Sequence, residues 1–175
     1  CSPQSRELRS AVWGDVAGNA LNDSDRHYRE GEAVFDPGPG FFRPESRPSR
    51  DLSVLLACHQ AANASRPLNW LDLMAGCGVR ALRWGHEAAP LAAVAARISA
   101  NDADPERLIW LESNLASLRS AGVALTLSTR SAEGLLAEAF LAGQTFDFID
   151  LDAFGSPGAL LQPALKTLAF GGILF

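Results

Sequence analysis

The sequence is poor in several residue types on which common architectures depend. Its 175 residues include three cysteines, one methionine, one tyrosine and one lysine, although there are 14 arginines. Cys1, Cys58 and Cys77 are odd in number and far apart, so the sequence predicts neither a disulfide framework nor a zinc site. The three histidines share no metal-ligand spacing, and no metal centre is expected. Unpaired cysteines suit a reducing compartment, which predicts a cytoplasmic protein.

Long apolar runs and a positive net charge are also missing. The longest apolar runs, such as residues 89–96, are far too short to span a bilayer, and no signal peptide is visible, so no membrane association is expected. The formal net charge of −5 disfavours nucleic-acid binding over the whole surface but permits a local basic groove. With 47% hydrophobic residues, the composition predicts one globular domain with a sizeable core.

Helix-like and strand-like segments alternate through most of the chain. Residues 1–48 are rich in Gly, Pro and Arg and predict an irregular arm with room for a short hairpin, whereas residues 49–175 predict an α/β domain. Helices are expected over 49–65 (with Ser49 as N-cap), 79–88, 104–121, 131–141 and 156–170, and strands over 70–75, 94–99, 123–129, 146–153 and 172–175. This alternation predicts a parallel sheet with helices on both faces. Because the chain starts on Cys1 and stops as an apolar strand begins, we expect a fragment truncated after about the fifth strand.

A glycine turn follows the first expected strand. GCGVRA (76–81) fits the pattern G-x-G-x-x-G/A, and Asp102 follows Gly78 by 24 residues at the end of the next strand. A dinucleotide site uses these parts, with the acid on the ribose hydroxyls, so an NAD-dependent oxidoreductase is one reading. Asp72, four residues before Gly76, favours S-adenosylmethionine instead, because a carboxylate repels a pyrophosphate and attracts an ammonium or a sulfonium. A hydrogen-bonded strand-end role for Asp72 remains the alternative.

The stretch IDLDAFGSPG (149–158) ends an apolar strand on a carboxylate followed by an aromatic residue. An ordinary strand-to-helix loop, with Ser156 as N-cap, explains the Ser-Pro pair but not Asp152 or Phe154. Asp152 and the neighbouring Ala153 carbonyl suit methyl transfer to the exocyclic amine of a base, since a carboxylate localises the nitrogen lone pair and accepts the proton. Phe154 suits stacking of a base that has been flipped out.

Four motifs in order carry a resemblance to one family. FFRPESRPSRDLS (41–53), LDLMAGCGVRALRW (71–84), SAND (99–102) and FIDLDAFGSP (148–157) resemble those of the tRNA (guanine-26-N2)-dimethyltransferases. The resemblance implies a Rossmann-like class I methyltransferase fold, S-adenosylmethionine as cofactor, tRNA as partner and methylation of the N2 amine of a guanine. It covers roughly three quarters of the chain, from about Phe41 to Phe175, and lacks the family's C-terminal domain.

Carried over to this sequence, the resemblance implies a role for each matching residue. Arg50 and Arg80 would contact the cofactor beside Asp72, Gly76 and Gly78, Asp102 would hold its ribose, Ala103 would lie against the adenine, Ser131 and Ala132 would lie beside the adenine amine, Asp152 would be the catalytic carboxylate, and Phe41, Arg43, Ala153 and Phe154 would bind the substrate. On the residues alone, Arg50 reads as a surface salt bridge and Arg80 as a solvated helix residue. Because Arg43, Arg47 and Arg50 face only Glu45 within 43–50, tRNA contact is expected there.

Three positions depart from the family pattern. Ala153 stands where the family has Pro, Ser131 where it usually has an acid, and Arg43 where it has Asn. These departures support a further hypothesis, a methyltransferase-like module that binds RNA and cofactor without turnover.

Overall fold

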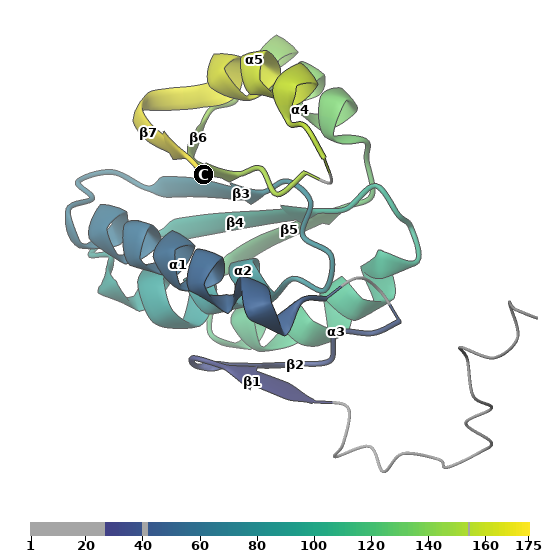
Figure 1. Cartoon of the computed structure of the whole chain (residues 1–175). Coiled ribbons are helices and arrows are strands. Elements are labelled where there is room, and N and C mark those ends of the chain that lie inside the picture. Colours follow the sequence, from purple (N-terminus) through teal and green to yellow (C-terminus); the bar gives the residue numbers. More distant parts are fainter. Residues whose placement is uncertain (1–26, 40–41, 154) are drawn as a thin grey trace, which may run out of the picture.

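A five-stranded parallel sheet forms the centre of the protein, which we describe from a computed structural model covering residues 27–39, 42–153 and 155–175 (Figure 1). The strands lie in the order β5-β4-β3-β6-β7 and every neighbouring pair is parallel. Their bounds are β3 Leu68–Asp72, β4 Ala96–Asn101, β5 Ala124–Ser128, β6 Phe146–Asp150 and β7 Leu168–Leu174. The chain order reverses at β3, which lies between β4 and β6, so the predicted doubly covered α/β architecture is confirmed.

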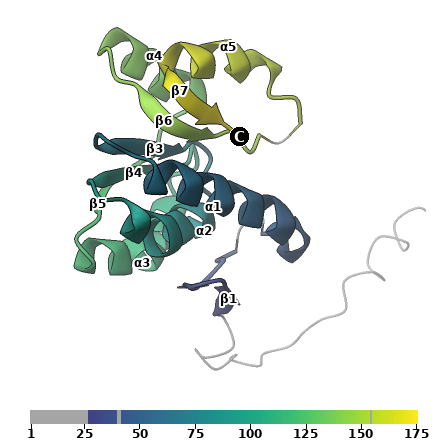
Figure 2. The ribbon, with the colours of Figure 1, turned by 90° about the vertical axis from the view of Figure 1, so that its left-hand side faces the viewer.

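Helices cover both faces of this sheet, as the two perpendicular views show (Figures 1 and 2). One face carries α1 (Arg47–Ala62), α2 (Val79–Arg83) and α3 (Arg107–Ser120), and the other carries α4 (Ala132–Leu141) and α5 (Gly158–Thr167). Neighbouring strand residues point to opposite faces: Trp70 and Phe148 enter the α1–α3 core, whereas Leu71 and Ile149 enter the α4–α5 core. All four are fully buried, as expected for the central strands of a sheet that is covered on both faces.

A hairpin in the N-terminal arm packs on the outside of the α1–α3 layer (Figure 2). Its strands are β1 (Tyr28–Glu30) and β2 (Ala33–Phe35), paired antiparallel, and its Ala33 and Phe35 side chains are buried in the main core. The arm therefore contributes the short hairpin for which the sequence left room, and residues 28–35 belong to the packed body.

Several element ends differ from those expected. A 3₁₀ turn, η4 (Pro44–Ser46), leads into α1, whose N-cap is Ser46 rather than Ser49, so the expected boundary at residue 48 falls inside the helix. Pro48 explains the shift, because its fixed φ suits the first helical turn. After α2 the chain continues as a π-helical turn, η5 (Trp84–Ala88), and a 3₁₀ turn, η6 (Ala89–Leu91).

The C-terminal elements are shifted as well. Strand β6 ends at Asp150 instead of residue 153, and α5 begins at Gly158 with Pro157, not Ser156, as its N-cap. Strand β7 starts at Leu168, four residues before the strand that the sequence predicted. The sequence pattern did not reveal the full strand because its periodicity is interrupted, by Gly171 with a φ of 77° and by an irregular register with β6. Ser131 caps α4 as predicted, with its Oγ accepting a hydrogen bond from the Gly134 amide at 3.1 Å. Among the described residues, no helix is both long and apolar enough to cross a membrane.

Candidate cofactor-binding and active site

A cavity of about 620 Å³ opens at the carboxyl ends of β3, β4 and β6. This edge is where parallel α/β sheets bind their ligands, and the volume is in the range of small-molecule sites. Nine of the predicted site residues line it: Arg43, Arg50, Asp72, Gly76, Arg80, Asp102, Ala103, Asp152 and Ala153. Segments far apart in sequence therefore meet at one site.

The glycine turn between β3 and α2 forms the floor of the cavity. Gly76 has a φ of 55°, which favours glycine, and its amide donates a hydrogen bond to Oδ2 of Asp102 at 2.8 Å. The second oxygen of Asp102 accepts from the Asp104 amide at 3.0 Å. The carboxylate of Asp102 is thus fixed at the end of β4, where carboxylate lone pairs can also accept from a ligand's hydroxyl groups.

Asn101, which the sequence reading missed, holds three strand ends together beneath this turn. Its buried amide donates to the carbonyls of Leu73 and Arg130, both at 3.0 Å, and its Oδ1 accepts from the Ser128 hydroxyl and the Arg130 amide. An asparagine directly before Asp102 was the available signal, because a buried amide needs several partners.

Asp72 is buried at the end of β3, beside Asp150 on the neighbouring strand. One of its oxygens accepts a hydrogen bond from the Ala81 amide at 3.3 Å. Burial, and then the negative charge of Asp150, raise the pKa of Asp72 to about 8, against the opposing effect of Arg80. Burial likewise raises the pKa of Asp150 to about 6, with Arg80 opposing and Asp152 adding to the shift.

This raised pKa predicts a pH-dependent stability. Between about pH 4 and pH 8 the folded chain keeps a proton on Asp72 that the unfolded chain releases, so the free energy of unfolding falls as pH rises through this window. Asp150 contributes in the same direction up to about pH 6. We expect Asp72→Asn to remove the fall between pH 6 and pH 8, where one proton accounts for a slope of up to about 1.4 kcal/mol per pH unit. Urea unfolding of both proteins from pH 5 to pH 8.5 measures this, and identical slopes would contradict it.

Arg80, expected on the surface or at the cofactor, is buried between two carboxylates. Its Nη1 donates to Asp150, and its Nη2 donates to Oδ2 of Asp152 at 2.7 Å. Its guanidinium carbon lies 5.6 Å from the centre of the Phe175 ring. The side chain of Asp152 is 62% exposed, so the arginine connects the strand interior to a carboxylate at the cavity mouth.

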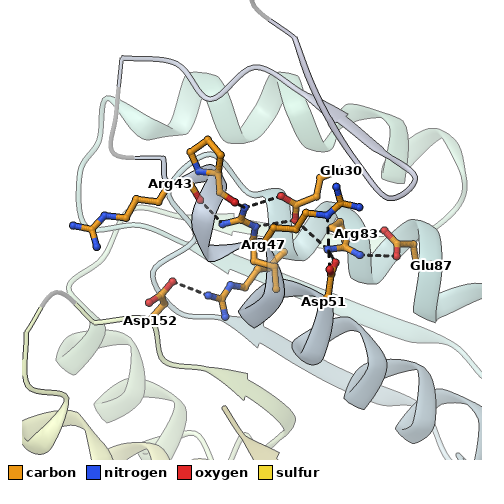
Figure 3. Close-up of polar contacts among 10 residues, drawn as sticks. Glu30, Arg43, Arg47, Asp51, Arg83, Glu87 and Asp152 are labelled. Carbon is orange, nitrogen blue, oxygen red and sulfur yellow. Dashed lines mark hydrogen bonds and ion pairs between the residues drawn. The ribbon is translucent and has the colours of Figure 1, made fainter.

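Arg50, which lines the cavity, belongs to a second cluster of buried ion pairs. Figure 3 shows the Glu30 and Arg83 side chains of this cluster. The Nε and Nη2 of Arg50 donate to the two carboxylate oxygens of Glu30 at 2.8 and 2.6 Å, and its Nη1 donates to the Arg43 carbonyl at 3.1 Å. Arg83 shares Glu30 at 3.0 Å and also pairs with Asp51 and Glu87. Arg50 is therefore neither a surface salt bridge nor available to RNA, and Glu30, Asp51 and Glu87 were not anticipated.

The remaining predicted residues fall into three groups. Arg43 is exposed on the cavity rim, where it extends away from the buried cluster, and Arg47 is an exposed side chain paired with Asp51 at 3.7 Å (Figure 3). Gly78 packs against α3, while Ser131 caps α4 and Ala132 is buried in the α4–α5 core; none of these three lines the cavity. Phe41 and Phe154 lie outside the described residues.

Comparison with solved structures first defines the fold. The chain is similar to a SAM-dependent methyltransferase from Agrobacterium tumefaciens, with a TM-score of 0.67 at 18% identity over 85% of this chain and 50% of that one. The fold is that of the Rossmann-like class I methyltransferases, as predicted.

Sequence comparison then gives the family. The chain belongs to the N2,N2-dimethylguanosine tRNA methyltransferase family, which it matches over residues 21–175. It is 34% identical to the tRNA (guanine(26)-N(2))-dimethyltransferase of Methanoregula boonei, over 75% of this chain and 31% of that protein. It is 31% identical to the protein of the same name from Pyrobaculum calidifontis, over 83% of this chain and 41% of that protein. The chain spans about a third of the length of most of these curated relatives.

Proposed function

We propose that the chain carries S-adenosylmethionine-dependent methyl transfer to the exocyclic N2 amine of a tRNA guanine, at position 26. The observation that carries this proposal is the carboxylate of Asp152, which Arg80 holds at 2.7 Å beside a cavity lined by Asp72 and Asp102. The names of its relatives, tRNA (guanine(26)-N(2))-dimethyltransferases, supply the substrate and the position. We place the activity in the cytoplasm, where tRNA and free thiols such as Cys58 and Cys77 are found together.

The donor set of the cavity suits this cofactor. Asp72 lines the cavity beside the glycine turn, where an ionised carboxylate would repel the pyrophosphate of a dinucleotide. An ammonium or sulfonium in the same place is attracted, and it favours the ionised form of Asp72. Asp102 presents a fixed carboxylate for a ribose diol. S-adenosylmethionine, when bound, supplies an electrophilic methyl group.

Asp152 would perform the proton chemistry. Its exposed oxygen accepts a hydrogen bond from the guanine amine, which localises the nitrogen lone pair toward the methyl group. Once the amine nitrogen had accepted the methyl group it would carry a positive charge, and Asp152 would take up the proton that it releases. The Ala153 carbonyl is the adjacent acceptor that we assign to the same amine, and Phe41, Arg43 and Phe154 remain our candidates for holding the target base and its flanking phosphates.

Loss of the Asp102 carboxylate is expected to weaken cofactor binding. A charge-assisted contact of this kind contributes about 1.5–3 kcal/mol, so Asp102→Ala should lower the affinity for S-adenosylhomocysteine roughly 10- to 150-fold in calorimetry. Because Asp102 also accepts from the Gly76 amide, Asp102→Asn serves as the matched control that keeps an oxygen for the turn. Unchanged affinity in both variants would remove Asp102 from the ribose site.

One transfer experiment tests the function itself. The whole protein in which this chain occurs is incubated with labelled S-adenosylmethionine and an unmodified tRNA transcript, beside the same transcript carrying adenine at position 26. Label on the first transcript alone supports the proposal. If the protein binds tRNA and S-adenosylmethionine but transfers no methyl group, it is better described as an RNA-binding module. If it binds NADH tightly and does not bind S-adenosylhomocysteine, it is better described as an oxidoreductase.

A further inference from the structure

Asp150 is a buried carboxylate for which the proposed chemistry has no direct use. Its side chain is 1% exposed at the end of β6, and its backbone carbonyl accepts a hydrogen bond from the Leu73 amide at 3.1 Å. It is therefore fixed to the central strand as well as to its own. Its carboxylate accepts from Nη1 of Arg80, 70 residues away in the chain.

Arg80 links the fixed carboxylate of Asp150 to the carboxylate of Asp152. The guanidinium is planar and rigid, so an Nη1 atom held by Asp150 determines where Nη2 presents its hydrogen. That hydrogen is directed at Asp152, at 2.7 Å, and the Phe175 ring lies on the same guanidinium. Asp152 itself lies beyond the end of β6, outside regular structure, so the strand does not orient its side chain.

Stability alone is a weak explanation for this arrangement. Desolvation offsets most of the attraction within a buried ion pair, and burial raises the pKa of Asp150, which records part of that penalty. Strand β6 provides a comparison: Asp147, at its other end, is also buried and accepts from Arg66 and from the Asn69 amide. That pair is remote from the cavity, and Arg66 is 57% exposed.

We propose that Asp150 is a positioning residue for the transfer step, which holds the carboxylate of Asp152 in its reactive orientation through the guanidinium of Arg80. The inference rests on the proposed function and extends it to a residue to which that function assigns no chemical step.

The test compares Asp150→Asn with Asp147→Asn in the whole protein. Three quantities are measured for each: the single-turnover methylation rate at saturating cofactor and tRNA, the affinity for S-adenosylhomocysteine, and the thermal midpoint. Both variants lose a buried carboxylate from the same strand, so both are expected to be less stable. Asp150→Asn should lower the rate about 10- to 100-fold, because a neutral amide accepts a weaker hydrogen bond from Arg80 than a carboxylate does and so positions Asp152 less precisely. Its cofactor affinity should stay within about threefold, and Asp147→Asn should keep the wild-type rate.

Several outcomes would overturn the inference. They are a wild-type rate in Asp150→Asn, an equal rate loss in Asp147→Asn, or a loss of cofactor affinity that accounts for the slower rate. If Asp150→Asn does not fold, Arg80→Lys decides, because a single ammonium cannot bridge two carboxylates as the guanidinium does; an undiminished rate there also rejects the inference. Failure of the proposed function is separate, since the wild-type protein would then transfer no methyl group to tRNA.

Discussion

Asp152→Asn is expected to lower methyl transfer by about 10²- to 10⁴-fold, the usual contribution of a general base. The asparagine side chain can still accept a hydrogen bond from the guanine amine, and from Arg80, but it is a poor proton acceptor. Single-turnover methylation of an unmodified tRNA transcript by the whole protein measures the loss.

Cofactor binding is the internal control for this variant. The carboxylate of Asp152 is largely exposed and follows β6, whereas Asp102 follows β4 on the other side of β3, so the affinity for S-adenosylhomocysteine should be retained. A near-normal rate of methyl transfer in this variant would reduce Asp152 to a polar residue of an ordinary strand-to-helix loop.

The largest expected effect on stability comes from Glu30. Its carboxylate accepts hydrogen bonds from Nε and Nη2 of Arg50 and from Nη1 of Arg83, and all three side chains are about 5% exposed. Glu30→Gln takes away the carboxylate with which Arg50 pairs, whereas Arg83 keeps Asp51 and Glu87. Breaking a buried ion pair in this way costs about 3–5 kcal/mol. The loss is measured as the free energy of unfolding in urea.

Glu32→Gln is the matched control, because Glu32 is an exposed glutamate on the same hairpin. Surface substitutions of this kind usually change the free energy of unfolding by less than about 0.5 kcal/mol. If the two variants were equally stable, Glu30 would not be what joins the hairpin to α1 and α2.

The order of helices and strands was predictable because it depends on local patterns. Apolar runs, a glycine turn and a Ser N-cap such as Ser131 each act within a few residues, and they predicted the sheet and its functional edge. The starts of α1 and β7 were misplaced for equally local reasons. Pro48 suits a first helical turn as well as a loop, and Gly171 interrupts a strand that continues on both sides of it.

The site was predictable to the same extent. Asp72, Gly76, Asp102 and Asp152 follow strand ends, so alternation of elements was enough to bring them together. The partners of the buried arginines were not predictable, because ion pairing depends on distances that the sequence does not encode locally. Arg80 and Asp150 are 70 residues apart, and Arg83 and Glu30 are 53 apart. Each reads as an ordinary surface charge until the fold buries it.

Because β3 lies between β4 and β6, the residues of the site come from two separate halves of the chain. Asp72, the glycine turn and Asp102 belong to β3, β4 and the loops after them, whereas Asp150 and Asp152 belong to β6 and its exit. The halves meet along the β3–β6 pairing, where Asp72 lies opposite Asp150, and through Arg80, which crosses from one to the other. Substitutions that weaken the β3–β6 pairing or the Arg80 bridge should therefore leave the affinity for the methyl donor unchanged. They should slow methyl transfer, because the donor and the base are no longer aligned.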